Sequence, residues 1–400
     1  MSLTAAIRAS QPFPAQEAFV PFHRASIGRQ EIDAVVDVLQ SGWLTTGLRT
    51  KQFESEFARF IGATYPVAVS SCTAALHLAL AVIGITEGDE VIVPTMTFSS
   101  TSQVVLYFKA KPVLVDSKHD SFHLDPEKIE QAITPRTRAI LPVHYAGIPC
   151  DMDQILDVAR NYDLKVIEDA AHALPARYRG RLVGTFGDLA CFSFYATKTV
   201  TTGEGGMVVT ENQEYADRAR MLSSHGISRD AWKRYTAEGT WRYDILDIGY
   251  KYNMTDLAAA LGLVQLAKCE EMRAQRAMVA ERYTQALASH VAFAAPQIPG
   301  HIEHAWHLYV MKVNQSALRI SRDRVIEELK RRGIGTSVHY IPLHLHPLYQ
   351  NRLGYRNGQF PHAEKHFECA ISLPIYPGMT LAETDRVIAA LHDIAREYRR

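Results

Sequence analysis

The chain has 400 residues, of which 47% are hydrophobic and 22% are charged, as in a soluble globular protein of two or more domains. Lysine plus arginine equals aspartate plus glutamate at 43 each, so no global positive field would recruit nucleic acid or an anionic membrane. The most apolar stretch, residues 74–85, is too short to span a bilayer, and the N-terminal residues lack the apolar core of a signal peptide. Five scattered cysteines without CxxC spacing indicate a reducing compartment, so we expect a cytoplasmic protein.

Up to about residue 215, short β-rich runs alternate with helical periods. The expected strands cover residues 66–70, 90–93, 112–115, 139–141 and 164–167. Expected helices end at Gly62, begin at Asp125 and span residues 151–162. Strands separated by helices of this length predict an α/β fold with a mostly parallel sheet and helices on both faces.

The second half of the chain has a different pattern. Residues 252–289 are expected to be long, charged and helical, and a strand at 308–311, a helix at 322–332 and a closing helix from Thr384 follow. We therefore expect three parts. They are an N-terminal tail (1–20), a large α/β domain (21–265) and a small C-terminal α+β domain (266–400).

Three groups of polar residues follow expected strands, and ligands of open parallel sheets bind beyond the carboxyl ends of strands. The first group, Ser70-Ser71-Cys72-Thr73, directly precedes a helix. Backbone N–H groups and the Thr73 hydroxyl there would bind an anion, although an ordinary helix cap has the same pattern. The second group, Glu168-Asp169-Ala170-Ala171-His172, places two acids at the end of an apolar strand. A buried carboxylate needs a partner such as a protonated ring nitrogen, and the alternative is a capping aspartate on an exposed loop.

The third group is an aromatic run, residues 192–195, followed by Lys198 and a glycine-rich turn. A lysine in this setting is placed to reach inward, whereas a lone lysine is usually a solvated charge. Together the three groups predict one site. Lys198 would form a Schiff base with an aldehyde cofactor, Asp169 would keep a pyridine nitrogen protonated, and the helix N-terminus with Ser193 would hold a phosphate.

Six motifs occur in order along nearly the whole chain, from about Pro21. They are SSCTAALHLAL, GDEVIVPTMTF, PVHYAG, EDAAHA, FSFYATKTVTTGEGG and GYKYNMTDLAAALGLVQL. With these motifs the sequence resembles the DegT/StrS sugar aminotransferase family of fold-type-I pyridoxal-phosphate enzymes. The resemblance implies pyridoxal 5'-phosphate as cofactor and a large parallel-sheet domain followed by a smaller C-terminal one.

The resemblance also assigns roles to single residues. It makes Lys198 the Schiff-base residue and proton carrier, and Asp169 the partner of the pyridine nitrogen. His172 falls where the family has a His or Gln near the ring hydroxyl, and Phe98 where an aromatic side chain packs on the cofactor face. A lysine at position 198 also argues against the family branch that removes the 3-hydroxyl of sugars, because that branch has histidine there.

Further matches fall at the phosphate: Cys72, Thr73 and Ser193 of the same chain, and Asn253, which in the family reaches the phosphate from the neighbouring subunit. The resemblance therefore implies a homodimer with shared active sites. Cys72 stands where Gly or Ala is common, so only its backbone is expected to take part.

Histidines and arginines complete the candidate set. His301, His304 and His307 are spaced by three, but residues three apart on a strand point to opposite faces, so we expect structural or substrate-lining histidines and no metal site. His339 lies in a loop that resembles the family's substrate loop and is expected to touch the sugar or diphosphate. Arg229 and Arg234 would bind an acidic donor or the diphosphate, or else are solvated surface residues.

The expected activity is a ping-pong transamination in which glutamate leaves as 2-oxoglutarate and a nucleotide-linked keto-sugar accepts the amine. The segments HYAG, GYKYNMTD and HAWHLY look most like the branch that aminates position four of UDP-linked 4-keto sugars. The alternatives are amination at position three of a dTDP-linked sugar, a non-catalytic regulator that binds cofactor or sugar, and a different pyridoxal reaction such as racemisation or decarboxylation.

Overall fold

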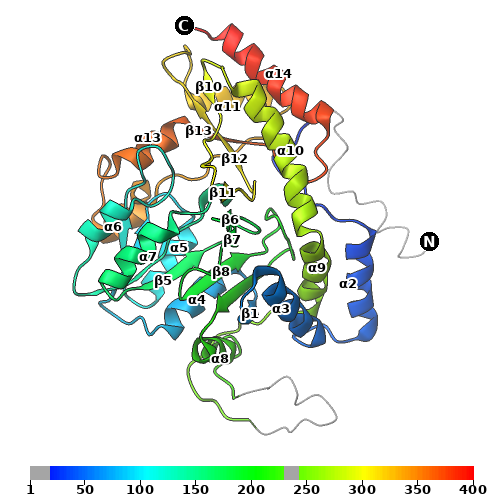
Figure 1. Cartoon of the computed structure of the whole chain (residues 1–400), viewed down its shortest axis with the longest axis vertical. Coiled ribbons are helices and arrows are strands. Elements are labelled where there is room, and N and C mark those ends of the chain that lie inside the picture. Colours follow the sequence, from blue (N-terminus) through cyan, green and yellow to red (C-terminus); the bar gives the residue numbers. More distant parts are fainter. Residues whose placement is uncertain (1–18, 229–242) are drawn as a thin grey trace.

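The computed structural model describes residues 19–228 and 243–400, and its centre is a seven-stranded sheet (Figure 1). The strands, in spatial order, are β1 (Tyr65–Val69), β9 (Gly206–Thr210), β8 (Leu189–Ser193), β5 (Lys165–Asp169), β4 (Thr137–Ile140), β2 (Glu90–Pro94) and β3 (Lys111–Val115). β9 pairs antiparallel with β1 and β8, and the other pairs are parallel. The predicted α/β class is thus confirmed, and each of the five expected strands is present within two residues of its expected bounds.

Helices connect and cover these strands. They are α3 (Leu48–Ile61), α4 (Cys72–Val82), α5 (Ser99–Tyr107), α6 (Pro126–Ala132), α7 (Met152–Asn161) and α8 (Gln213–Leu222). α4 is the most deeply buried, since every residue in it except Thr73 is buried. Its alanines and leucines pack against valines of β1, β2 and β9 and form one hydrophobic core with them. This burial removes enough apolar surface from water to fix the position of the helix and therefore of its N-terminus.

The C-terminal part forms a second core around an antiparallel sheet of β10 (Phe293–Ala294), β12 (Tyr309–Val313) and β13 (Ala370–Leu373). The helices around it are α10 (Cys269–Leu287), α11 (Arg322–Arg331) and α14 (Leu381–Glu397). Val20 also packs in this core, and it forms a bridge with Ile334. The chain therefore starts its described part on the C-terminal unit before it enters the large one.

Smaller elements complete the described fold. They are α2 (Arg29–Ser41), α9 (Asp256–Ala267), α12 (Pro347–Leu353), α13 (Pro361–Cys369), and a sheet of β11 (Ile302–Glu303), β6 (Arg177–Tyr178) and β7 (Arg181–Leu182). α9 packs against α2 and α3, whereas α10, which follows it along one side of the molecule, packs against α14 (Figure 1). This change of packing partner supports the proposed domain boundary near residue 265. Among the helices of residues 19–228 and 243–400, none has both the length and the apolar composition needed to cross a bilayer.

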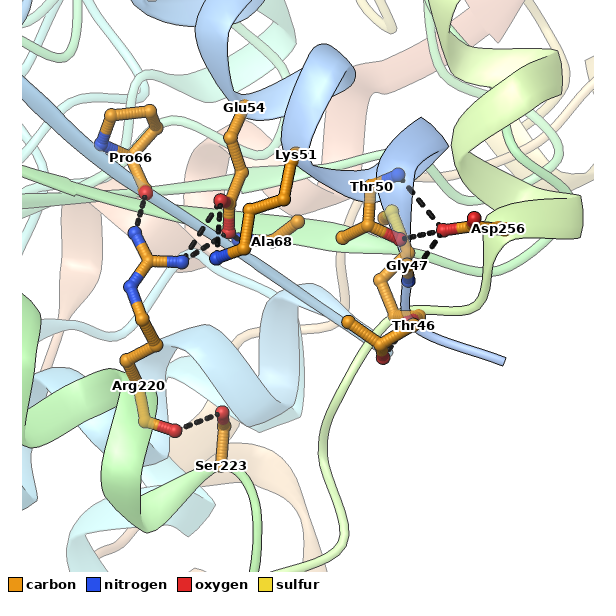
Figure 2. A network of polar contacts seen from close by, with 11 residues as sticks. Thr46, Gly47, Thr50, Lys51, Glu54, Pro66, Ala68, Arg220, Ser223 and Asp256 are labelled. Atoms are coloured by element: carbon orange, nitrogen blue, oxygen red, sulfur yellow. Dashed lines mark hydrogen bonds and ion pairs between the residues drawn. The ribbon is translucent and has the colours of Figure 1, made fainter. Parts of the chain in front are cut away.

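Two buried carboxylates fix the region around α3 (Figure 2). Asp256, at the start of α9, accepts hydrogen bonds from the backbone N–H groups of Gly47 (2.8 Å) and Thr50 (2.9 Å), and so caps the N-terminus of α3. Glu54 accepts two bonds from Arg220 at 2.7 and 2.9 Å and one from the Ala68 N–H at 3.0 Å. These contacts tie α3 to α8, α9 and the end of β1.

Candidate active site

The carboxyl ends of β1, β8 and β5 meet at one edge of the sheet, separated only by β9, which runs in the opposite direction. The three polar groups singled out in the sequence follow these strands, so the fold brings them together. Lys198 is close enough for its charge to shift the pKa values of Cys72, Asp169, His172 and His339. The predicted site is therefore a single site at this edge.

The N-terminus of α4 lies directly against β9. Ser71 is the N-cap and accepts a hydrogen bond from the Ala74 N–H at 3.1 Å, and Cys72 and Thr73 open the helix. A Cβ on Gly206 would lie 2.5 Å from the carbonyl of Ser71, so only glycine permits this approach. Gly206 pairs with Ser193, whose hydroxyl thus lies on the strand next to the helix N-terminus. This combination of free helix N–H groups and hydroxyls suits a phosphate.

The two acids at the end of β5 have different surroundings. Glu168 accepts bonds from the N–H groups of Gly184, Phe186 and Gly187 (2.7–2.9 Å) and from His144 Nε2 at 3.1 Å. Burial opposes its ionisation, but these bonds bring the pKa of Glu168 below its ordinary value. Its role is therefore structural, within the sheet and the loop after β7.

Asp169 is buried as well, but it has fewer partners. Its Oδ2 accepts a bond from Thr101 Oγ1 at 2.8 Å, and its Oδ1 accepts one from the Ala171 N–H at 3.1 Å. Burial raises the pKa of Asp169, while these bonds and the charge of Lys198 oppose the rise. A carboxylate that is buried and still short of a counter-charge suits a protonated ring nitrogen.

Lys198 follows β8 in a tight turn, where its backbone N–H donates to the Tyr195 carbonyl at 2.9 Å. Burial lowers its pKa to about 8, although the neighbouring Cys72 and Asp169 raise it. Much of the amine is therefore neutral near pH 8, as a nucleophile toward an aldehyde must be. The alternative of a solvated surface lysine does not fit these surroundings.

His172 is buried and hydrogen-bonded on both sides. Its Nδ1 accepts from the Ala146 N–H at 3.3 Å, so Nε2 carries the proton and donates to the Tyr340 hydroxyl at 2.9 Å. Burial, and then the charges of Lys198 and His339, hold the pKa of His172 well below its ordinary value. The ring of His307 lies 4.4 Å from that of His172, centroid to centroid. His172 is thus a neutral donor in a fixed orientation.

Two further predicted residues border this group. Phe98 precedes α5 and is 57% exposed, with its ring 5.8 Å from that of Tyr340, so its face is available to a bound ring. His339 stacks on Phe22 at 5.6 Å, and its Nδ1 is 2.8 Å from Ser372 Oγ. Burial, with the charge of Lys198 adding to it, lowers the pKa of His339 to about 4. Phe98 is thus linked to the site through Tyr340, which bonds to His172, and His339 through the charge of Lys198.

Comparison with known proteins agrees with this geometry. A model of the DegT/DnrJ/EryC1/StrS aminotransferase family matches residues 25–392. The chain belongs to this family. It is 51% identical over 384 residues to the uncharacterized protein MJ1066 of Methanocaldococcus jannaschii. This match covers 96% of this chain and 100% of that protein. It is 47% identical over 379 residues to the spore coat polysaccharide biosynthesis protein SpsC of Bacillus subtilis, with 94% and 97% covered.

Solved structures give the cofactor. Spr1654 from Streptococcus pneumoniae, assigned as a sugar aminotransferase, has been solved in a PLP-form and a PMP-form. The PLP-form superposes with a TM-score of 0.89 at 35% identity, and the match covers 95% of this chain and 99% of that one. The protein is accordingly a pyridoxal-phosphate-dependent sugar aminotransferase with the fold of this family. The donors described above fit the cofactor: a helix N-terminus for the phosphate, a buried carboxylate for the ring nitrogen and an amine for the aldehyde.

Asn253 does not line the same cavity as the other predicted cofactor residues within one chain. Its Nδ2 donates to Thr46 Oγ1 at 2.7 Å, and its backbone forms a bridge with Val69. It lines a cavity of ≈ 930 Å³ that includes Lys251 and Arg220 but none of the other predicted cofactor residues. Within the described chain its side chain therefore contacts Thr46 and none of the other predicted cofactor residues.

Other predictions have different outcomes. Arg229 and Arg234 lie outside the described residues. His304 and His307 are both buried, because Trp306 between them has a positive φ of 53° and strand β12 begins only at Tyr309. The alternation of faces expected for a strand therefore does not apply to them. Within residues 19–228 and 243–400, no group of three or more His, Cys, Asp or Glu side chains is arranged to hold a metal ion.

Several residues of the site were not predicted from the sequence. They are His23, Thr101, Arg276 and Tyr340, and their separation along the chain explains why. Tyr340 had one available signal, since it directly follows His339 in the same motif. Arg276 lies in α10, in a stretch that the sequence marks only as long, charged and helical.

Proposed function

We propose that this enzyme transfers the amino group of glutamate to a UDP-linked 4-keto sugar, with Lys198 as the covalent attachment point of the cofactor. The observation that carries the proposal is the meeting of Lys198, Asp169 and the N-terminus of α4 at one sheet edge. The segments HYAG, GYKYNMTD and HAWHLY support position four and the UDP nucleotide. The name of the relative SpsC supports a role in making sugars for a polysaccharide.

The roles of the residues follow from their surroundings. When bound, pyridoxal phosphate supplies an aldehyde that accepts the amino group and a ring that stores the electron pair of the broken C–H bond. In the first half-reaction Lys198 Nζ would take the proton from the α-carbon of glutamate, and in the second it would deliver a proton to the sugar carbon that receives the amine, on the same face of the ring. Asp169 keeps the ring nitrogen protonated, because two hydrogen bonds hold its carboxylate in place.

The remaining residues bind and orient. Cys72 and Thr73 offer backbone N–H groups, and Thr73 and Ser193 offer hydroxyls, to the phosphate. His172 donates a hydrogen bond to the Tyr340 hydroxyl, and this bond would hold both side chains in place beside the ring hydroxyl of the cofactor. Phe98 would cover one ring face, and His339 would contact the sugar or the diphosphate.

We also propose a homodimer with shared sites, in which Asn253 reaches the phosphate of the partner subunit. Apolar side chains support an interface near Asn253. On the segment after α8, Ile245 is 72% exposed and Ile248 is 85% exposed, and α2 exposes Ile32, Val36 and Leu39 at helical spacing. Clustered exposed apolar residues of this kind are typical of subunit contacts.

A substrate screen tests the activity. The purified enzyme would be loaded with cofactor and mixed with glutamate and with UDP-, dTDP- and GDP-linked 3-keto and 4-keto sugars, and products would be identified by mass spectrometry. We expect amination only of UDP-linked 4-keto sugars, with one 2-oxoglutarate released per amine. Turnover restricted to a 3-keto or a GDP-linked sugar would contradict the proposal.

A further inference from the structure

Arg276 of α10 is a buried cation without a counter-ion. Its side chain is 1% exposed, and among the described residues no carboxylate lies within ion-pair distance of its guanidinium. Burial lowers its pKa to about 10, which reflects the cost of charge in these surroundings. A buried charge of this kind is normally paired with an anion, so its unpaired edge is a candidate for binding one.

The guanidinium donates hydrogen bonds to the described residues from only one of its nitrogens, Nη1. Nη1 donates to the carbonyls of Ile375 (2.9 Å), Trp306 (3.4 Å) and His307 (3.5 Å). Nε is buried without a partner, and Nη2 donates no hydrogen bond to any residue that the structure describes. The Nε–H and the adjacent Nη2–H point the same way and form the edge that binds a carboxylate through two parallel bonds.

This arginine belongs to the same site as the cofactor lysine. Arg276, Lys198 and His23 line one narrow void. Burial and the charge of Arg276, with a smaller effect of Lys198, lower the pKa of His23 to about 4, so that His23 adds no positive charge. The buried acid that favours the charged form of Lys198 is Asp169, which the proposed function assigns to the ring nitrogen.

The unpaired edge of Arg276 thus belongs to a residue beside Lys198, to which the proposed function assigns the reaction with the amino donor. The phosphate of the cofactor is assigned to the N-terminus of α4, so a carboxylate of the donor or the diphosphate of the sugar nucleotide remains. The void is too narrow even for a free water molecule, and residues 23–26 form one wall of it. A flat carboxylate along the guanidinium edge requires the least displacement of that wall, whereas a diphosphate requires far more.

We propose that Arg276 binds a carboxylate of the amino donor through its Nε and Nη2 edge. This inference rests on the proposed function, because it assigns the donor-binding residue of the same site. Wall residues 23–26 are held by two bonds, from His23 Nε2 to the Ala196 carbonyl (3.0 Å) and from Gln265 Nε2 to the Ser26 carbonyl (2.8 Å). These residues shift to admit the carboxylate and then cover it.

The first experiment separates the two half-reactions. Arg276→Lys keeps the charge and one donor to the carbonyls but loses the paired edge. We expect kcat/KM for glutamate, followed by loss of cofactor absorbance, to fall about 30- to 100-fold, since about 2–3 kcal/mol of charge-assisted bonding is lost. The reaction of the aminated enzyme with the keto-sugar should change less than about 3-fold.

Arg322→Lys is the matched control. Arg322 is also buried and bonds to the carbonyls of Phe367 and Ala370, but it is paired with Asp323 in the C-terminal unit. It should leave the ratio of the two half-reactions unchanged. Equal losses in both half-reactions for Arg276→Lys would show that the arginine only supports the fold, and would overturn the inference.

A second measurement needs no turnover. Glutarate carries the two carboxylates of glutamate but no amine, so its binding to the loaded enzyme, measured by calorimetry, reports carboxylate recognition alone. We expect binding to the natural protein, about 30-fold weaker binding to Arg276→Lys, and protection of residues 19–28 from hydrogen exchange when glutarate is bound. The exchange measurement on the natural protein keeps the test valid if the variant does not fold.

The outcomes distinguish the two proposals. A natural enzyme that reacts with glutamate and the keto-sugar, while its residues 19–28 gain no protection from glutarate, would overturn only the role of Arg276. A natural enzyme that uses neither substrate would overturn the proposed function, and the inference with it. If glutamine replaced glutamate as donor, the selective loss in Arg276→Lys should appear with glutamine.

Discussion

At the scale of single residues, Glu168 and Asp169 show how adjacent carboxylates take different roles. All four groups that contact Glu168 are donors, namely three backbone N–H groups and His144 Nε2. Asp169 is bonded only by Thr101 and one backbone N–H, so it can still accept a cation. The apolar run before the two acids predicts a buried strand end, but the sequence cannot say which acid is already satisfied, because the donors come from residues 144 and 184–187.

This difference predicts opposite effects of two matched substitutions. In Glu168→Gln the side-chain NH2 group would face other hydrogen-bond donors and find no acceptor. We therefore expect the free energy of unfolding to fall by about 3 kcal/mol, measured by urea denaturation of the apoprotein. Asp169→Asn should change stability less but lower kcat/KM about 100-fold or more, because the ring nitrogen loses its anionic partner. Similar losses of stability and activity in both variants would refute the division of roles.

The lowered pKa of Lys198 predicts a pH dependence for cofactor loading. With the pKa at about 8, the neutral amine increases as pH rises toward 8 and changes little above 9. At pH 7 about one-tenth of the amine is neutral, against about 0.03% for an unshifted lysine. The rate at which the apoprotein binds pyridoxal phosphate, followed by absorbance from pH 6 to 11, should therefore level off near pH 9. A rate that keeps rising beyond pH 10 would mean that burial does not shift this amine.

At the scale of elements, the contact between α4 and β9 determines the phosphate site. A Cβ at position 206 would lie 2.5 Å from Ser71 backbone atoms and 2.7 Å from the Cys72 nitrogen, and backbone cannot give way as a flexible side chain can. Gly206→Ala should push the helix N-terminus outward and weaken cofactor binding about 10-fold, measured by absorbance titration. Gly300→Ala is the control, since a Cβ there meets nothing within 4 Å, and it should bind cofactor normally. Unchanged binding in Gly206→Ala would show that the helix position is not critical.

Elements with strong local patterns were predictable, and others were not. The strand expected at 164–167 is β5 (Lys165–Asp169), because its apolar run is long enough to indicate burial on both faces. β9 was not predicted, since it begins at Gly206 in what looks like a glycine-rich turn, and its antiparallel direction depends on distant pairing. β6, β7, β10 and β11 have two residues each, too few to show any periodicity.

The candidate site shows the same limit. Lys198, Asp169 and the helix N-terminus each follow a recognisable strand, and the sheet order then brings them together. Arg276 enters the site from the C-terminal unit, about 80 residues further along the chain, and only the packing of α10 beside the large sheet reveals it. Residues that reach a site from a second unit have no local signal, so the sequence yields the cofactor site more completely than the substrate site.

At the scale of the whole molecule, the proposed homodimer assigns Asn253 to the active site of the partner subunit. Asn253 lines the ≈ 930 Å³ cavity and is held there by Thr46, on a loop that Asp256 fixes to α9 (Figure 2). None of the other predicted cofactor residues lines this cavity. If the dimer is the active unit, the catalytic lysine and this asparagine of one active site come from different subunits.

Complementation between two impaired variants tests this directly. Lys198→Ala should lower activity on the order of 1,000-fold or more, and Asn253→Ala should weaken phosphate binding and activity. In a mixed dimer with shared sites, one active site contains both defects and the other contains neither. After unfolding and refolding an equal mixture, half of the dimers are mixed, so activity should recover to about one-quarter of the natural level. If Asn253 served the site of its own subunit, no intact site would form and activity would stay at the level of the separate variants. Ile248→Asp should prevent the recovery by weakening the interface, whereas Leu381→Asp, at a position at the start of α14 that is also well exposed (70%, against 85% for Ile248), should not.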